Sequence, residues 1–255
     1  MIANYHTHTP RCRHAIGSER EYIENAIRSG FKILGFSDHS PQFYKNGFVS
    51  GMRMTVKEAP EYVSTVKKLA DEYKNDITVY VGFEAEYFPD IFDSLCRFCR
   101  DYGVDYLIMG QHFLRSEQSG VYTGSPCNDK KILTEYVNTA TEGISTGSFS
   151  YIAHPDLCNF TGDEEFYREE MTRLCNEAKK RGIPLEINML GHSTGRFYPS
   201  KRFFETAAKV GADTVIGCDA HDPRSLIDTD AQAGVEDFAR SLGISPLEKI
   251  HLNKI

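Results

Sequence analysis

The chain begins MIANYHTHTPRCRH, residues 1–14, where a short apolar run is followed by polar side chains, an order that recurs along the chain. A short apolar run, residues 2–5, leads directly into His6 and His8. Extended runs also occur at Ile33–Phe36, Ile77–Phe83, Tyr106–Met109, Phe149–Ala153, Pro184–Ile187 and Asp213–Gly217. Polar side chains follow these six runs in turn: Asp38 and His39, Glu84, Gln111 and His112, His154, Asn188, and Asp219 and His221.

Amphipathic helical stretches alternate with these runs. Residues 19–29 place Tyr22, Ile23 and Ala26 on one face, and the same periodicity occurs in residues 55–73, 91–102, 131–145, 164–180, 200–210 and 230–242. Apolar strands that alternate with helices predict a parallel sheet covered by helices. Active sites of α/β barrels form at the carboxyl ends of the strands, so reactive side chains at every end favour closure over an open sheet. We therefore expect an α/β fold, a seven-stranded (β/α) barrel.

Length and composition restrict the possible functions. The 255 residues contain no linker and no internal repeat, which predicts a single domain over residues 1–255. The formal net charge of −7 argues against a nucleic-acid partner, although bound metal ions would still allow an anionic substrate. No apolar run approaches membrane length, and the N-terminal residues do not form a signal peptide, so we expect no membrane partner and a cytoplasmic location.

Imidazoles and carboxylates gathered at strand ends are the ligands of a multinuclear transition-metal site. His6 and His8 form an H-x-H pair, and alternate residues of a strand share one face. Glu84 is the candidate bridging carboxylate, and Glu86, on the same face, is its competitor or a residue at the rim. Asp38 directly precedes His39, so it should point away from it and either orient an imidazole or donate a proton. The pattern predicts metal-assisted hydrolysis.

Seven short motifs together resemble a known family. They are HTHTPRCRH (6–14), SDHSP (37–41), GFEAE (82–86), GQHF (110–113), AHPD (153–156), LEIN (185–188) and GCDAH (217–221). In this order they resemble the PHP (polymerase and histidinol phosphatase) superfamily over almost the whole chain. The resemblance implies a distorted, TIM-like seven-stranded barrel with three divalent transition-metal ions: zinc, iron or manganese.

The resemblance also implies a ligand set for each ion. His6, His8, Glu84 and Asp219 would hold the first metal. Glu84, His112 and His154 would hold the second, and His14, His39 and His221 the third. No ligand position is missing, which argues against a non-enzymatic metal-binding module. An amidohydrolase-type barrel shares H-x-H but brings a bridging lysine where this chain has Glu84.

The single-domain length and the GMRMT segment, residues 51–55, resemble the stand-alone histidinol-phosphate phosphatase branch. This implies a metal-dependent phosphomonoesterase that converts L-histidinol phosphate to L-histidinol and phosphate with a metal-bridging hydroxide. The alternative is a PHP phosphoesterase that acts on another small phosphate ester or a nucleotide.

The predicted substrate-binding residues are Arg53, Arg196 and Asn188, because guanidinium groups match phosphate oxygens and Asn188 ends a strand. Together with Asp38, the two arginines are also the candidate catalytic residues. Surface salt bridges are an equally plausible role for each arginine. The aromatic-rich segment 40–54 is either a lid over the site or a packed Ω-loop.

The seven cysteines are expected to be free thiols. Cys96 and Cys99 have C-x-x-C spacing, but they fall within an expected helix and have no second pair. Cys12 lies between two expected ligands, His8 and His14, and its role is open. The role of His192, in the segment that follows Asn188, is open as well.

Overall fold

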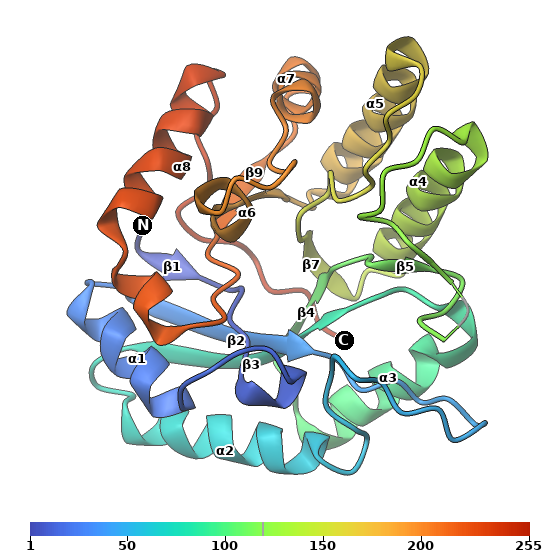
Figure 1. Ribbon diagram of the computed structural model, residues 1–255. Coiled ribbons are helices and arrows are strands. Elements are labelled where there is room, and N and C mark those ends of the chain that lie inside the picture. Colours follow the sequence, from blue (N-terminus) through green and yellow to red (C-terminus); the bar gives the residue numbers. More distant parts are fainter. Residues whose placement is uncertain (119) are drawn as a thin grey trace.

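Seven parallel strands form one sheet in the order β1-β2-β3-β4-β7-β8-β9, and helices surround it (Figure 1). This computed structural model describes residues 1–118 and 120–255. The strands are β1 Ala3–Asn4, β2 Ile33–His39, β3 Thr78–Ala85, β4 Tyr106–Met109, β7 Phe149–Ile152, β8 Leu185–Asn188 and β9 Thr214–Gly217. The helices are α1 Glu19–Arg28, α2 Ala59–Glu72, α3 Pro89–Tyr102, α4 Lys130–Ser145, α5 Glu164–Arg181, α6 Met189–Ser193, α7 Lys201–Val210 and α8 Thr229–Ser241. The 3-10 turns η1 Pro10–Cys12 and η2 Pro223–Ile227 and a small antiparallel pair, β5 Phe113–Leu114 and β6 Val121–Tyr122, complete the described elements.

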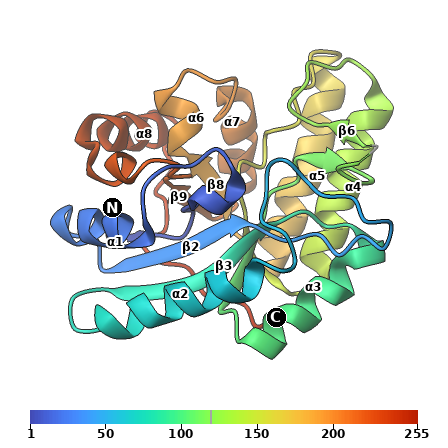
Figure 2. The same cartoon turned by 60° about the horizontal axis from the view of Figure 1, so that its bottom comes forward.

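The sheet curves, with helices on its outer side (Figure 2), and β1 and β9 are its two end strands. A parallel bridge joins Thr7 to Ala220, just beyond both strands. The amide of His8 donates to the carbonyl of Ala220 at 2.9 Å, and the amide of Ala220 donates to the carbonyl of His6 at 3.1 Å. The predicted barrel is therefore confirmed as a nearly closed, TIM-like one, and the backbone of the H-x-H segment forms its seam.

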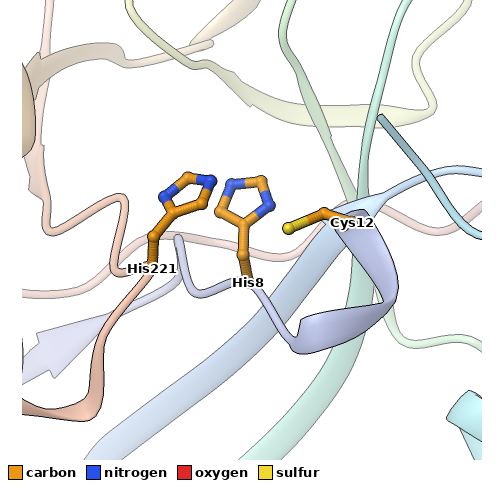
Figure 3. Close-up of side chains that lie close together, drawn as sticks. All are labelled: His8, Cys12 and His221. Carbon is orange, nitrogen blue, oxygen red and sulfur yellow. The ribbon is translucent and has the colours of Figure 1, made fainter. Parts of the chain in front are cut away.

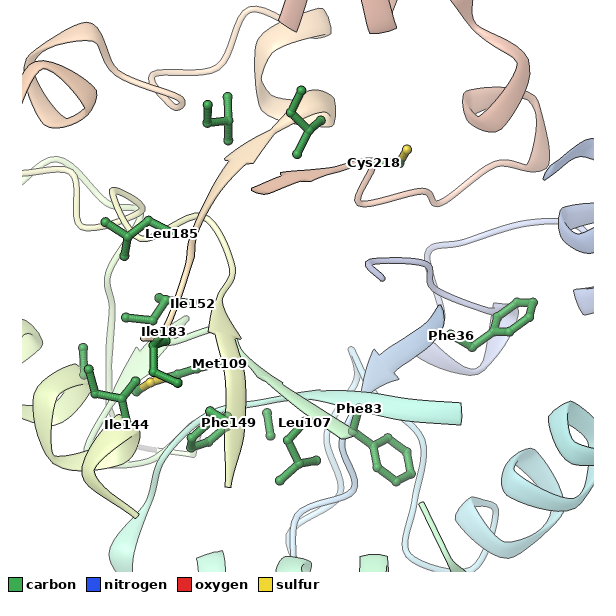
Figure 4. Packing of buried hydrophobic residues seen from close by; sticks show 14 of the residues in the cluster. Phe36, Phe83, Leu107, Met109, Ile144, Phe149, Ile152, Ile183, Leu185 and Cys218 are labelled. Atoms are coloured by element: carbon green, nitrogen blue, oxygen red, sulfur yellow. The ribbon is translucent and has the colours of Figure 1, made fainter. Parts of the chain in front are cut away.

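Two apolar clusters fill the molecule. The larger one lies between the strands and the surrounding helices and includes Leu107, Met109 and Phe149, which Figure 4 shows with their neighbours. The smaller one includes Tyr5, Tyr106 and residues from β7 and β9, and the C-terminal tail covers it through Ile250 and Leu252. The buried hydroxyl of Tyr106 donates to the carbonyl of Tyr5 at 2.7 Å.

Sequence periodicity predicted all seven sheet strands and the seven longer helices to within a few residues of their observed bounds. The strand β1 ends early, at Asn4, because the Asn4 side chain bonds the turn that follows. The hairpin β5–β6 and the short helix α6 were not predicted, since each contains too few residues to show a period. None of the described helices is both long enough and apolar enough to cross a lipid bilayer.

The first prediction concerns the packing around Tyr106. A Cβ atom on Gly82 would lie 2.5 Å from Cε1 of Tyr106, so Gly82→Ala should lower the free energy of unfolding by about 1–3 kcal/mol through overpacking. Urea unfolding measures this change. Gly51→Ala is the control, because a Cβ there would meet no atom within 4 Å, and equal stability of the two variants would contradict this packing.

Candidate metal centre

The turn after β1 brings His6 and His8 together. Asn4 organises this turn: its Oδ1 accepts from the amides of His6 at 3.2 Å and Cys218 at 2.8 Å, and its Nδ2 donates to Thr7 Oγ1 at 2.8 Å. The Nε2 atoms of His6 and His8 then lie 3.1 Å apart. Two imidazole nitrogens this close together indicate that both bind the same ion.

Asp219 faces the same pair from the other side of the seam. Its Oδ1 lies 3.4 Å from His6 Nε2 and 3.2 Å from His8 Nε2. The side-chain nitrogen of Asn188 donates to Asp219 Oδ2 at 3.1 Å and so fixes the carboxylate. Asp219 adopts a left-handed backbone conformation with φ +50°, which is costly for a residue other than glycine and is typical of functional positions.

Glu84 lies at the centre of the cluster. One carboxylate oxygen is 2.8 Å from His154 Nε2 and 3.4 Å from His112 Nε2, while the other is 3.0 Å from His39 Nδ1. His154, like Asp219, has a left-handed backbone, with φ +31°. A carboxylate placed between groups of imidazoles on both sides has the geometry of a bridging ligand.

A third group lies toward the outside of the mouth. Ligand atoms of His14, His39 and His221 lie within 4.8 Å of one another. The ring of His14 is oriented by the carbonyl of Cys12, 2.7 Å from its Nδ1. The Nδ1 of His221 lies 3.0 Å from the carbonyl of Asp219. Both rings therefore turn Nε2 toward the cluster.

All nine predicted ligands converge at the mouth. Eight of them, together with Cys12, form five overlapping groups of three potential ligands, in each of which the ligand atoms lie within 4.8 Å of one another. His112 is outside these five groups, but its Nε2 lies 3.4 Å from Glu84, and its ring packs against those of His39 and His154 with centroids 5.1 and 5.0 Å away. The assignment of each residue to a particular ion remains a prediction.

Sequence reasoning missed Glu186, a fully buried carboxylate inside the barrel on β8. Its Oε1 lies 2.7 Å from His6 Nδ1, and its Oε2 accepts from the amide of His154 at 2.9 Å. A hydrogen bond to the distal nitrogen of a metal-binding imidazole fixes its orientation. The sequence did contain a clue, because an ionisable residue within the apolar run LEIN has to have a buried partner.

Asp38 and Glu86 lie behind the ligands. Asp38 Oδ1 is 3.6 Å from His8 Nδ1, and its Oδ2 accepts from the amide of Thr9 at 3.2 Å. Glu86 Oε1 is 3.6 Å from His112 Nδ1. Of the two roles predicted for Asp38, these contacts support orientation of an imidazole.

Buried charges of both signs balance one another in the cluster. Burial alone would lower the pKa of His6, but Glu186, Asp219 and Glu84 outweigh it and raise that pKa to about 10. Burial would raise the pKa of Glu84, but His112, His39 and His6 hold it well below its usual range. The carboxylates thus require positive charge beside them, as protons or as metal ions.

The residues fit metal ions. Glu84 Oε2, His39 Nδ1 and His221 Nε2 are buried and have no hydrogen-bond partner among the described residues. Glu84 Oε2 and His39 Nδ1 are 3.0 Å apart without the orientation of a hydrogen bond. Buried polar atoms that converge without satisfying one another leave their lone pairs for a cation. The mixed nitrogen and oxygen set suits zinc, iron and manganese.

A cavity of about 280 Å³ opens over the cluster. Its lining comprises His8, His14, His39, Met52, Glu84, His112, Tyr122, His154, Leu157, Leu190, Arg196, Tyr198, Asp219 and His221. The structure thus places Arg196 beside the metal ligands, as its predicted role requires. Arg196 donates to the hydroxyl of Tyr198 at 2.6 Å, which holds the guanidinium at the wall.

Arg53 is not at the cavity, contrary to the role predicted for it. It is 1% exposed, and its guanidinium donates to Glu117 at 2.6 Å, to Glu86 at 2.8 Å and to the carbonyl of Ser40 at 3.2 Å. Both neighbouring carboxylates are buried too, so the guanidinium is committed to them. Arg53 therefore anchors segment 40–54, and its guanidinium is hydrogen-bonded to residues outside the cavity lining.

The side chain of Asn188 is also hydrogen-bonded to other residues of the protein. Its oxygen accepts from the amide of Gly191 at 2.8 Å, and its nitrogen donates to Glu186 and Asp219. It positions a ligand, which differs from the predicted contact with substrate.

Segment 40–54 supplies only Met52 to the cavity, while Phe43 packs against Phe98 with ring centroids 5.9 Å apart. His192 packs against Phe238, with ring centroids 5.8 Å apart, and is not part of the cavity lining.

A barrel with imidazoles and carboxylates gathered at the carboxyl ends of its strands defines a metal-dependent barrel enzyme. The sequence pattern of the PHP domain matches residues 4–189, and the chain belongs to this family. A probable histidinol-phosphatase of Deinococcus radiodurans is 26% identical over 230 residues, 87% of each chain.

Two solved structures share the fold. One is histidinol phosphate phosphatase from Lactococcus lactis, complexed with zinc, L-histidinol and phosphate, with a TM-score of 0.73, 18% identity and 98% of each chain covered. The other is a histidinol phosphatase structure from Listeria monocytogenes, described as putative, with a TM-score of 0.72, 20% identity and coverage of 90% of this chain and 99% of that one.

The second prediction separates the two glutamates of GFEAE. Glu84→Gln should lose bound metal and activity together, because Glu84 contacts imidazoles on both sides. Glu86→Gln should retain metal, since Glu86 pairs with Arg53 behind the cluster. Elemental analysis of both purified variants measures this difference, and metal loss in Glu86→Gln alone would reverse the assignment.

The third prediction concerns the metal-free protein. The pKa of His6 is raised from 6.5 to about 10 in the folded state, so its proton stabilises the fold below pH 6.5 and this stability is lost as the pH rises toward 10. Urea unfolding after chelation should show that decline. Metal-loaded protein is the control and should not show it, because metal binding needs the deprotonated ring. Equal profiles with and without metal would contradict this explanation.

Proposed function

We propose that the chain is a metal-dependent phosphomonoesterase that hydrolyses L-histidinol phosphate to L-histidinol and phosphate. The observation that carries the proposal is the convergence of nine potential metal ligands beneath a cavity whose wall contains Arg196. The histidinol-phosphatase names of the relatives support this choice of substrate. Residues 1–255 act as one domain in this proposal.

Three ligand sets would hold three divalent ions, of zinc, iron or manganese. They are His6, His8, Glu84 and Asp219; Glu84, His112 and His154; and His14, His39 and His221. The chemistry that bound divalent ions supply is Lewis acidity toward phosphate oxygens and acidification of a water molecule. The orienting contacts of Glu186, Asp38 and Glu86 keep the imidazole rings facing the cavity.

Arg196 would bind the outer oxygens of the phosphate group. Burial alone would lower the pKa of Arg196, but Tyr198 raises it, so the guanidinium stays charged. It lies in the same cavity wall as the metal ligands, and its planar fork matches phosphate geometry. Its hydrogen bond to Tyr198 leaves other donors of the guanidinium for a substrate.

Apolar side chains at the rim would enclose the alcohol part of the substrate. Met52, Tyr122, Leu157 and Leu190 line the cavity and come from four different segments. Tyr122 belongs to the hairpin β5–β6 and offers a partly exposed ring that could stack on an imidazole. Selectivity for the alcohol would therefore come from the rim, while the metal cluster would act on any phosphate ester.

The fourth prediction tests phosphate recognition. Arg196→Ala should keep its metal ions but lose about a hundredfold in kcat/KM, the effect of removing one charge-assisted hydrogen bond. Steady-state kinetics and elemental analysis on the same sample measure both. Arg224→Ala is the control, because Arg224 is exposed and pairs only with Asp222 in the described structure. Unchanged kcat/KM in Arg196→Ala would remove Arg196 from the site.

The fifth prediction tests the substrate. With full metal occupancy, kcat/KM for L-histidinol phosphate should exceed that for p-nitrophenyl phosphate by orders of magnitude, because only the former has an alcohol part matched to the rim. Chelation should abolish both activities. A nucleotide or another small phosphate ester that is hydrolysed faster would leave a PHP phosphoesterase with a different substrate.

A further inference from the structure

A cysteine side chain faces the metal cluster. A ring nitrogen of His8, a ring nitrogen of His221 and Sγ of Cys12 lie within 4.8 Å of one another. Figure 3 shows the sulfur of Cys12 beside the ring of His8, with His221 on the opposite side of that ring. The ring centroids of His8 and His221 are 4.0 Å apart. The three side chains thus form a mixed sulfur and nitrogen group.

The turn η1 holds the sulfur in this place. The amide of Cys12 donates to the carbonyl of Thr9 at 3.1 Å, and Arg13 follows in a left-handed conformation with φ +71°. The carbonyl of Cys12 meanwhile orients His14. The backbone of Cys12 therefore orients one predicted ligand, while its side chain lies beside two others, His8 and His221.

Cys12 differs from the other buried cysteines. Cys96, Cys99, Cys158, Cys175 and Cys218 all belong to the larger apolar cluster, where a thiol acts as a small hydrophobic side chain. Cys12 is equally buried, with 0% exposure, yet belongs to neither of the described apolar clusters.

Two ring nitrogens next to Cys12 lack hydrogen-bond partners in the described part of the chain, which indicates a site for a ligand. His8 Nδ1 and His221 Nε2 are buried and lack a hydrogen-bond partner among the described residues. The side chain of His8 is only 1% exposed, and the nearest carboxylate oxygen to its Nδ1, Oδ1 of Asp38, is 3.6 Å away, which is beyond hydrogen-bond distance. Buried nitrogens of this kind beside a sulfur atom are suited to a soft cation.

We propose that Cys12 binds, as a thiolate, the metal ion that His221 holds, with His8 lining the same position. The thiol proton passes to solvent as the sulfur–metal bond forms. This inference rests on the proposed metal dependence but not on the identity of the substrate. A thiolate donor favours zinc, ferrous iron or cobalt at this position over manganese or magnesium, which prefer oxygen ligands.

Cobalt(II) provides the test, because a cobalt–thiolate bond gives a charge-transfer absorption in the near ultraviolet that nitrogen and oxygen ligands do not. Metal-free, reduced protein is titrated with cobalt under anaerobic conditions. The thiolate band should appear in the wild-type protein and be absent in Cys12→Ser, while the visible cobalt bands persist in both. Cys127→Ser is the matched control, because Cys127 is a free, partly exposed cysteine that is in none of the potential ligand groups.

A competition experiment gives a second measurement. Wild-type protein and Cys12→Ser are dialysed against mixtures of zinc and manganese, and both ions are then quantified. Loss of the thiolate should lower the ratio of retained zinc to retained manganese by at least about tenfold. Removing a residue that only hydrogen-bonds to a metal ligand already weakens metal binding by about that factor. Circular dichroism of the metal-free proteins shows whether Cys12→Ser folds.

The outcomes separate this inference from the proposed function. A wild-type protein that binds cobalt without a thiolate band overturns the role of Cys12 and leaves metal dependence intact, whether or not the variant folds. A band that survives in Cys12→Ser overturns it as well. Failure of the wild-type protein to bind cobalt, zinc or manganese at all contradicts the proposed metal-dependent function itself.

Discussion

Three carboxylates are buried at one end of the barrel, and their charge determines which side chains must surround them. Glu84, Glu186 and Asp219 are at most 5% exposed. A buried carboxylate without a partner costs several kcal/mol, so positive charge has to lie beside each of them. Although burial opposes it, these carboxylates raise the pKa of His6 to about 10, and protonated imidazoles can supply that charge. Divalent ions supply it with deprotonated imidazoles, so protons and metal ions compete for one electrostatic role.

The backbone conformations at this end are costly and are held by the surrounding structure. The left-handed conformations of His154 and Asp219 each cost about 1–3 kcal/mol. Glu186 bonds the amide of His154, and Asn188 bonds the carboxylate of Asp219, so β8 fixes both positions. The opposite end of the barrel is filled by an apolar cluster around Tyr106 and covered by the C-terminal tail. Burial of this apolar cluster contributes stability that offsets the cost of the left-handed backbone conformations at the metal-binding end.

Much of this architecture could be predicted from the sequence, because the parallel sheet dictates where strand ends lie. The strand β4 has the predicted bounds, Tyr106–Met109, since its four apolar residues are buried on both faces. The predicted ligands converge for the same reason. Glu186 was missed because its partner His6 is 180 residues away, and no local pattern records that contact. Arg53 was misplaced because its residue type suits phosphate, whereas its actual neighbours are two buried glutamates.

The residues at the rim of the cavity are positioned by loops, whereas the ligands beneath them are positioned by strand ends. Its side chains, Met52, Tyr122, Leu190 and Arg196, come from segments that share neither a period nor a sheet position. Asn46 and Gln118 join two of these segments by a hydrogen bond of 2.6 Å, a contact between residues far apart in the sequence. Strand ends can therefore be predicted from periodicity, whereas the rim depends on loop packing. Because the barrel fixes the ligands and the loops fix the rim, changes in the loops can alter the alcohol that is accepted without disturbing the metal cluster.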